Sequence, residues 1–155
     1  MAHRDGDGWI ECRCGGRHWG LNGAAGLLLI RDQKIMMQHR APWVHNGDTW
    51  GLPGGARDSH ESVEEAAIRE TVEETGINPS HVKVISVFSD DHFDWRYDTV
   101  IAVADNSLET TTWNTETHDI GWFEISEIEK LTLHPSFAKT WFYLKLEVLK
   151  IINTF

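Results

Sequence analysis

The chain has 155 residues, of which 25% are charged and 41% hydrophobic, a composition typical of one folded domain with a buried core. Its net charge of −10 argues against a general binder of nucleic-acid polymers, because that task needs a basic surface. No apolar run approaches the roughly 20 residues of a membrane span, and the first residues lack the apolar segment of a signal peptide. Two cysteines are too few for a disulfide framework, so we expect a cytoplasmic protein. From the lack of a long apolar run we also expect no membrane partner.

The expected elements alternate between strands and helices without a regular repeat. The apolar run Ala24–Ile30 and the segment Lys34–Arg40 are predicted to form two strands joined by a turn. Residues 41–55 contain Pro, Asn-Gly and Gly-Gly and are predicted to form a loop. Further along the chain we expect a helix over 63–75, strands over 81–89, 97–105 and 118–125, a short helix over 126–131 and a long helix from about 136 to 151. This order predicts an α/β fold with a mixed central sheet covered on both faces.

The helix over 63–75 has well-marked ends. Ser62 and Glu65 have the spacing of a capping box, and Gly76 suits the left-handed residue that stops a helix. These signals fix where the helix begins and ends, and therefore which of its residues share a face.

The second half of this helix carries three glutamates on one face. At about 100° per residue, Glu70, Glu73 and Glu74 fall within one wedge, together with the small residues Ala66 and Ala67. One interpretation is a solvated acidic face. The other is a set of inward-facing carboxylates, which cannot all stay ionised unless a cation or basic group compensates them. The helical wheel alone leaves both open.

The wider pattern around this helix favours the second interpretation. A glycine, five residues, a glutamate, seven residues and then "RETVEETGI" resembles the Nudix box, G-x5-E-x7-R-E-U-x-E-E-x-G-U. The positions that match are Gly55, Glu61, Arg69, Glu70, Glu73, Glu74, Gly76 and Ile77. Thr71 stands where the family usually has an aliphatic packing residue. The preceding "WGLPG" is also similar to the family, and the resemblance extends over about residues 24–131.

The length predicts a single domain over 1–155, and the resemblance implies that it is a hydrolase with an α/β/α sandwich that cleaves a nucleoside diphosphate linked to another moiety. Oxygen ligands of this kind suit Mg²⁺ or Mn²⁺. Carried over position by position, the metal ligands are the backbone carbonyl of Gly54 and the side chains of Glu70, Glu73 and Glu74. The substrate would be a small nucleotide-type molecule.

The other fixed positions of the box are expected to hold these metal ligands, the carboxylate cage, in place. Arg69 would pair with the carboxylates and hold their rotamers, although a plain surface salt bridge is the alternative. Gly55 would give the sharp entry to the loop, and Glu61 would hold the loop against the helix.

The reaction also needs a general base and residues that contact the substrate. The resemblance offers two bases, Glu70 within the box and Glu116 in the later polar loop, and the sequence does not choose between them. Arg40, at the end of the second strand, is a candidate phosphate contact, and Trp95 is a candidate for stacking on a base. Both residues also have purely structural interpretations.

Two further functional classes stay open. The segment "ECRCGGRHWG" brings Cys12, Cys14 and His18 together in a hairpin over about residues 1–22, which raises a zinc-stabilised binding module appended to the hydrolase. The C-x-C spacing and the lack of a second cysteine pair favour a plain hairpin with reduced thiols. A catalytically silent nucleotide sensor is the other class, and the intact box carboxylates argue against it.

The last helix has two apolar stripes. One contains Phe137, Trp141, Leu144, Val148 and Ile151, and the other contains Ala138, Phe142, Leu146 and Leu149. One stripe is explained by packing on the domain. The second would be covered either by the chain itself, against the amino-terminal hairpin, or by a second copy in a homodimer.

Overall fold

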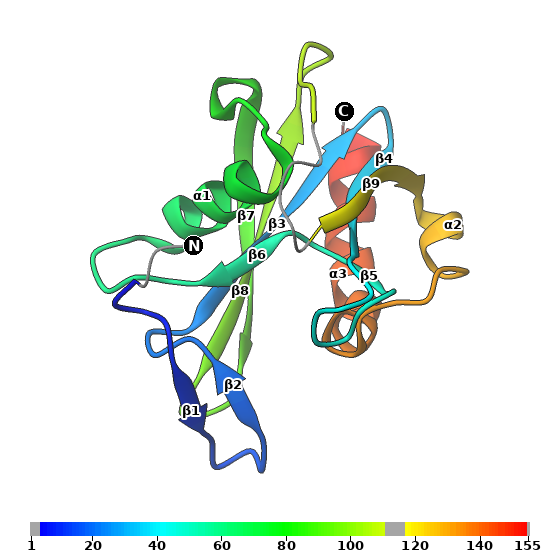
Figure 1. Ribbon diagram of the computed structural model, residues 1–155. Helices are drawn as coiled ribbons and strands as arrows, with labels where there is room; N and C mark the ends of the chain where they lie inside the picture. Colours follow the sequence, from blue (N-terminus) through cyan, green and yellow to red (C-terminus); the bar gives the residue numbers. More distant parts are fainter. Residues whose placement is uncertain (1–3, 111–116, 155) are drawn as a thin grey trace.

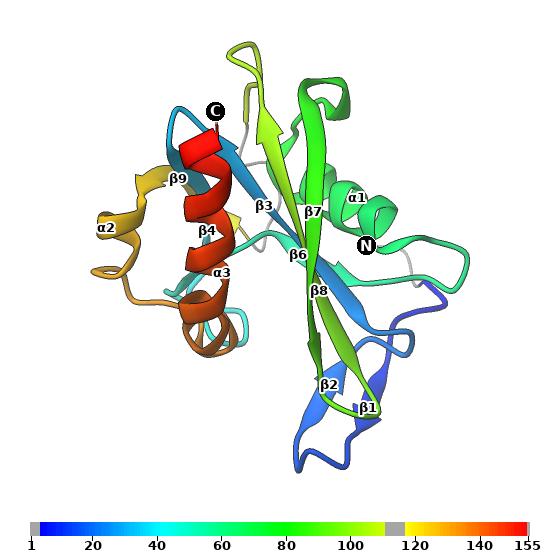
Figure 2. The same cartoon turned by 180° about the vertical axis from the view of Figure 1, so that it is seen from behind.

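The computed structural model describes residues 4–110 and 117–154, which place a mixed sheet between helical layers (Figures 1 and 2). The strands of this sheet are β3 (Ala24–Arg31), β4 (Lys34–Arg40), β5 (Trp50–Gly51), β6 (Gly54–Ala56), β7 (Val82–Asp91), β8 (Arg96–Ala104) and β9 (Thr117–Glu124). The helices are α1 (Val63–Thr75), the 3₁₀ turn η1 (Pro79–His81), α2 (Ile125–Ile128) and α3 (Pro135–Thr154). The predicted α/β class and mixed, doubly covered sheet are confirmed.

Strand β3 forms the centre of the sheet. Its residues from Ala24 to Ile30 are all buried, and they pair in parallel with β8 from Tyr97 to Val103. A strand covered on both faces needs a continuous apolar run, which is what this segment supplies. The turn to β4 places Asp32 and Gln33 at φ angles of 51° and 64°, the left-handed geometry that suits a tight hairpin.

The sheet divides at the end that carries the candidate site. Strands β3 and β4 pair only beside their turn, through Ile30↔Ile35 and Arg31↔Lys34. Beyond that point β6 pairs with the start of β3, and β5 pairs with the end of β4. The prediction of a loop over 41–55 was therefore wrong for residues 50–51 and 54–55, because pairing with distant strands outweighs the local glycine and proline signals.

Two separate apolar cores lie on the two faces of the sheet. On one face Ala66 and Ala67 of α1 pack against alternate residues of β3, such as Leu27 and Leu29. On the other face α3 packs its large side chains against Leu28 and its neighbours. Figure 2 shows α3 in front of the sheet and α1 on the far side. The result is an α/β/α sandwich.

Helix α1 has the predicted ends. The Ser62 hydroxyl accepts from the Glu65 N–H, the Glu65 carboxylate accepts from the Ser62 N–H, and Gly76 adopts a φ of 69°. Thr71 is fully buried, and its hydroxyl donates to the Ala67 carbonyl at 2.7 Å, so it occupies a packing position without an unpaired hydroxyl. The caps thus fix which face α1 turns to the sheet.

The amino-terminal hairpin consists of β1 (Trp9–Glu11) and β2 (Arg17–Trp19), which pair with each other. It lies beside the turn between β7 and β8 (Figure 1). The short helix predicted over 126–131 is confined to α2, and the chain turns after Ile128. None of the helices in the described part of the chain is long and apolar enough to cross a membrane.

Candidate active site

The carboxylates of α1 converge on the short strand β6. Glu70 and Glu74 are buried, and the Glu73 side chain is 28% exposed. The Gly54 N–H donates to Glu74 Oε2 at 3.1 Å, which ties β6 directly to the end of α1. The interpretation of a solvated acidic face is therefore excluded for Glu70 and Glu74.

The two glycines of β6 are required by close approach. A Cβ at Gly55 would lie 2.6 Å from the Glu70 carboxyl carbon, and one at Gly54 would lie 2.5 Å from the Ala25 carbonyl oxygen. No larger residue fits at either position without moving the strand or the carboxylate. The Gly-Gly pair thus allows the backbone to reach the glutamates.

Arg69 holds the carboxylates together. Its Nε and Nη2 donate to the two oxygens of Glu61 at 2.7 and 2.8 Å, and its Nη1 donates to Glu70 Oε1 at 2.9 Å and to Glu73 Oε1 at 3.4 Å. The Ala56 carbonyl accepts from Nη2 at 3.1 Å. These bonds raise the pKa of Arg69 and, together with the Asp58 N–H, hold the pKa of Glu61 below its ordinary value. Arg69 thus lies inside the site and holds its carboxylates together. This arrangement differs from a plain surface salt bridge, the alternative considered above.

The site carries more negative charge than its own arginine neutralises. Burial raises the pKa of Glu70, an effect that Arg69 opposes and Glu73 reinforces. The Glu73 Oε2 atom is buried and has no hydrogen-bond partner among the described residues. A buried carboxylate oxygen without a donor is costly, and a divalent cation is the kind of group that would satisfy it. The all-oxygen donor set suits Mg²⁺ or Mn²⁺.

A second arginine reaches this site from the amino-terminal segment. Arg4 Nη1 donates to Asp58 Oδ2 at 2.8 Å, and its Nη2 lies 3.6 Å from Glu73 Oε1. Although burial opposes ionisation of Asp58, Arg4 and the Gly6 N–H hold its pKa below the ordinary value. No local sequence pattern marks Arg4 as the partner of a residue so far along the chain, so this contact was not predicted.

Tyr97 closes the back of the site. Its hydroxyl occupies the space that a Cβ at Gly26 or Gly54 would need, and desolvation with the nearby charges of Glu74 and Glu70 raises the pKa of Tyr97. The phenol therefore stays protonated and can only donate or accept a hydrogen bond.

Comparison with known proteins agrees with this geometry. A family model described as the NUDIX domain matches residues 20–144. The chain belongs to the Nudix family. The crystal structure of a Nudix hydrolase from M. Smegmatis, RenU, superposes with a TM-score of 0.85 and 39% sequence identity, covering 94% of this chain and 97% of that one. The Nudix sandwich is thereby shown for nearly the whole chain.

One curated relative and one further solved structure extend the comparison. A Mycobacterium tuberculosis protein named "Putative 8-oxo-dGTP diphosphatase 3" is 43% identical over 148 residues, covering 88% of this chain and 68% of the relative. The structure of a C. elegans Ap4A hydrolase superposes with a TM-score of 0.69 at 20% identity, covering 85% of this chain and 99% of that one, a likeness of fold alone. The chain is a Nudix hydrolase that acts on phosphoric anhydride bonds, and its substrates are of the nucleotide type.

The remaining predicted site residues of this Nudix hydrolase lie in different places. Arg40 ends β4 at the divided end of the sheet, where its Nε donates to the His45 carbonyl at 3.1 Å. Trp95 lies in the β7–β8 turn and stacks on His18 of the hairpin, with ring centroids 4.3 Å apart. Glu116 lies outside the described residues. The structure thus brings the box residues together and places Trp95 in a contact with the amino-terminal hairpin.

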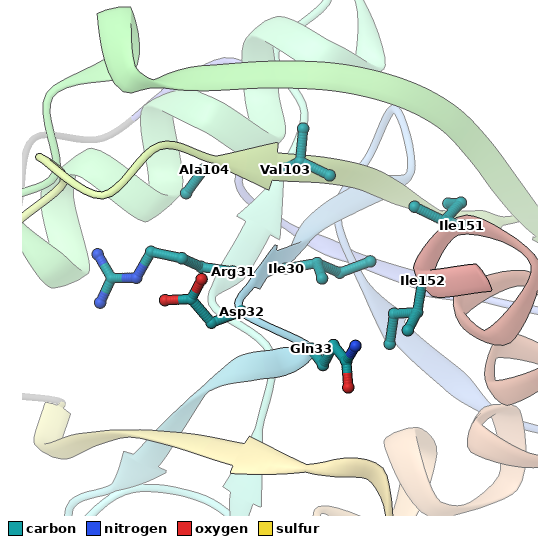
Figure 3. Close-up of a pocket in the computed structure, with 8 residues that line it drawn as sticks. All are labelled: Ile30, Arg31, Asp32, Gln33, Val103, Ala104, Ile151 and Ile152. Atoms are coloured by element: carbon teal, nitrogen blue, oxygen red, sulfur yellow. The ribbon is translucent and has the colours of Figure 1, made fainter. Parts of the chain in front are cut away.

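A separate pocket lies at the opposite end of β3 from the carboxylates. It is lined by the β3–β4 turn, the end of β8 and the last turns of α3 (Figure 3). Arg31 borders it but packs over the Trp122 ring at 4.2 Å and donates to the Leu108 carbonyl, so its guanidinium is already engaged. Figure 3 shows the Arg31 side chain extending away from Ile151 and Ile152. This pocket is thus separate from the candidate site at α1 and β6.

Proposed function

We propose that this Nudix hydrolase is a Mg²⁺- or Mn²⁺-dependent pyrophosphohydrolase of nucleoside polyphosphates. The observation that carries the proposal is the packing of Glu70 and Glu74 against β6, together with Glu73, which Arg69 joins to Glu70 and whose Oε2 is buried without a hydrogen-bond partner among the described residues. The backbone carbonyl of Gly54 would complete the ligand set with these three side chains.

The cation and the two arginines beside the carboxylates have distinct roles in this proposal. A divalent cation, when bound, neutralises charge on the phosphate oxygens and lowers the pKa of water. Arg69 keeps the carboxylates in place through its bonds to Glu61 and Glu70, so no ligand must reorganise when substrate arrives. Arg4 adds a positive charge beside Glu73 on the side of the amino-terminal segment.

The proton of the attacking water is assigned to one of two carboxylates. Glu70 is buried with its carboxylate facing Gly55, within the cage itself. Glu116 belongs to the loop before β9 and stays the second candidate. Whichever residue serves, its carboxylate accepts the water proton as the water oxygen attacks phosphorus.

The substrate class follows from the relatives' names and the local charges. The relative from Mycobacterium tuberculosis and another from Bacillus subtilis carry names that specify 8-oxo-dGTP. A purine nucleoside triphosphate is therefore our first proposed substrate. We propose Arg40 as a phosphate contact because it lies at the divided end of the sheet. Trp95 stays a proposed base-stacking residue, although its ring is already engaged with His18. A cytoplasmic location belongs to the same proposal, because nucleotides and Mg²⁺ are available there.

Turnover on a nucleotide panel tests the proposal. The purified protein would be incubated with Mg²⁺ and 8-oxo-dGTP, dGTP, ADP-ribose or Ap4A, and products separated by anion exchange. We expect a nucleoside monophosphate and pyrophosphate from the triphosphates, with no release in excess chelator. Binding of these nucleotides without turnover would instead identify the silent sensor.

We also propose that a second copy of the chain covers the outer face of α3. Phe142 is 71% exposed, Tyr143 58% and Leu146 54%, so the chain itself does not cover this stripe in the described structure. The hairpin that was the alternative cover lies beside the β7–β8 turn. A two-fold axis would place the same apolar face of each copy against the other.

A further inference from the structure

The amino-terminal hairpin gathers two thiols and an imidazole. The ligand atoms of Cys12, Cys14 and His18 all lie within 4.8 Å of one another, and Cys14 Sγ lies 3.1 Å from His18 Nε2. Both cysteines are free thiols; Cys12 is half-buried and Cys14 is exposed. Neither the carboxylate cage nor the Nudix reaction uses any of these atoms.

We propose that these three side chains bind one Zn²⁺ ion, with water in the fourth tetrahedral position. Thiolate and imidazole are the ligands that zinc prefers, whereas Mg²⁺ selects oxygen. Zn–S and Zn–N bonds of standard length in a tetrahedron separate sulfur from nitrogen by about 3.6 Å. The observed sulfur–nitrogen distance of 3.1 Å needs only a small opening of the hairpin to admit the ion.

The turn of the hairpin already holds the backbone in a suitable shape. The Gly15 N–H donates to the Cys12 carbonyl at 3.0 Å, and the Cys12 N–H donates to the Gly16 carbonyl at 3.0 Å. Gly15 has a φ of 95°, so the tight turn that closes after Cys14 depends on glycine. The turn therefore holds the two sulfur atoms within 4.8 Å of each other before an ion binds.

The imidazole is oriented by its neighbours. The His18 ring stacks on Trp95 with an interplanar angle of 9°, and its centroid lies 4.9 Å from that of His92. The stack fixes the ring plane while Nε2 points to Cys14.

The hairpin that carries the three proposed ligands already contacts the main sheet. Cys12 Sγ lies 2.6 Å from the His92 carbonyl, and Arg13 pairs with Asp94 through Nη2 at 2.9 Å, so the hairpin already contacts the β7–β8 turn. On binding, each cysteine releases its thiol proton to solvent and no electron is transferred; Cys12 Sγ thereby exchanges its hydrogen bond to the His92 carbonyl for a bond to the ion. The site is structural: it stabilises the native hairpin and takes no part in the hydrolysis.

Metal titration of the reduced protein tests the site. Protein stripped with chelator and kept in a phosphine reductant would be titrated with Zn²⁺ against a chromophoric chelator, and with Co²⁺ as a spectroscopic probe. We expect one ion per chain, a thiolate-to-Co²⁺ charge-transfer band, and a higher melting temperature with equimolar Zn²⁺. Millimolar Mg²⁺ should not displace the ion.

Variants separate this site from the carboxylate cage, which could also take up Zn²⁺. Removing an outer-shell partner of a metal costs 10–100-fold in affinity, so Cys14→Ser and His18→Asn, which remove a ligand, should lose at least about 100-fold. Glu11 lies on the same hairpin but is not one of the three proposed ligands, so Glu11→Gln should bind Zn²⁺ as tightly as the parent does. Glu73→Gln should also keep the charge-transfer band.

Two results would overturn the assignment. One is equal Zn²⁺ affinity in the parent and in Cys14→Ser, each measured on protein shown to be folded by circular dichroism. The other is a Cys12–Cys14 disulfide that forms in air and survives millimolar glutathione, detected by thiol counting, because it would consume both ligands under cellular conditions.

Discussion

Helices α1 and α3 pack on opposite faces of the same sheet, but they bury different kinds of side chain. The buried face of α1 carries Ala66 and Ala67 beside the carboxylates of Glu70 and Glu74. The buried face of α3 carries only large apolar side chains, Phe137, Trp141, Leu144, Val148 and Ile151. Small residues let α1 and its charged groups approach the sheet closely, whereas α3 supplies the larger share of apolar burial. We therefore expect substitutions at the carboxylate site of α1 to lower turnover, and substitutions in the buried face of α3 to lower stability.

The sharpest test of the α1 layer apart from the ligands themselves is Arg69→Lys. Lysine keeps the charge but loses the fork that binds Glu61, Glu70 and Ala56 at once. We expect turnover to fall about 10–100-fold and the Mg²⁺ concentration for half-maximal activity to rise. The exposed Arg13→Lys serves as the matched control. Unchanged Mg²⁺ dependence in Arg69→Lys would mean that Arg69 does not position the ligands.

In the α3 layer, Leu144→Ala should act on stability alone. Leu144 is 1% exposed, so its truncation leaves a cavity and lowers the free energy of unfolding by about 2–5 kcal/mol. Urea unfolding measures this loss, and turnover per folded molecule at low temperature should match the parent. A large loss of turnover without a loss of stability would break the separation between the two layers.

The outer face of α3 is tested by Phe142→Asp. If a second copy covers the exposed Phe142, the added charge should shift the protein from dimer to monomer at micromolar concentration. Light scattering gives the mass directly. Ser80→Asp, an exposed site at η1 on the α1 side of the sheet, adds the same charge as a control. A monomeric mass for the unmodified chain would rule the dimer out.

The smallest expected effect concerns His134, just before α3. Burial, with the charges of Arg40 and His45, lowers the pKa of His134 from 6.5 to about 4. Above pH 6.5 the residue is neutral in both states. Between pH 6.5 and 4 the unfolded chain takes up the proton and the folded chain does not, so stability falls as pH falls. His134→Gln should make urea midpoints at pH 7 and pH 5 more nearly equal; an unchanged difference would contradict this.

The sequence predicted the features that follow from the periodicity of a single helix. The helical wheel placed Glu70 and Glu74 on the same face as Ala66 and Ala67, and it placed the residues of α3 from Phe137 to Ile151 on one stripe; in the structure both sets are buried. Both predictions depend only on the geometry of a single element, which the local sequence determines.

Contacts between distant segments could not be predicted. Arg4 and Asp58 are 54 residues apart, and no periodicity relates them. Strand β6 lies in a Gly-Pro-rich segment and exists because Ala24 to Gly26 provide a partner. The stack of Trp95 on His18 likewise depends on how the hairpin packs against the β7–β8 turn, which only the assembled fold defines.

The most direct test of the cage is the Mg²⁺-dependent turnover of Glu73→Gln. The substitution keeps the size of the side chain but removes the charge from the carboxylate whose Oε2 is buried without a partner among the described residues. We predict that Glu73→Gln unfolds cooperatively like the parent, loses most of its turnover, and no longer melts higher when Mg²⁺ is added. Near-normal turnover of Glu73→Gln at saturating Mg²⁺ would contradict the assignment of the site.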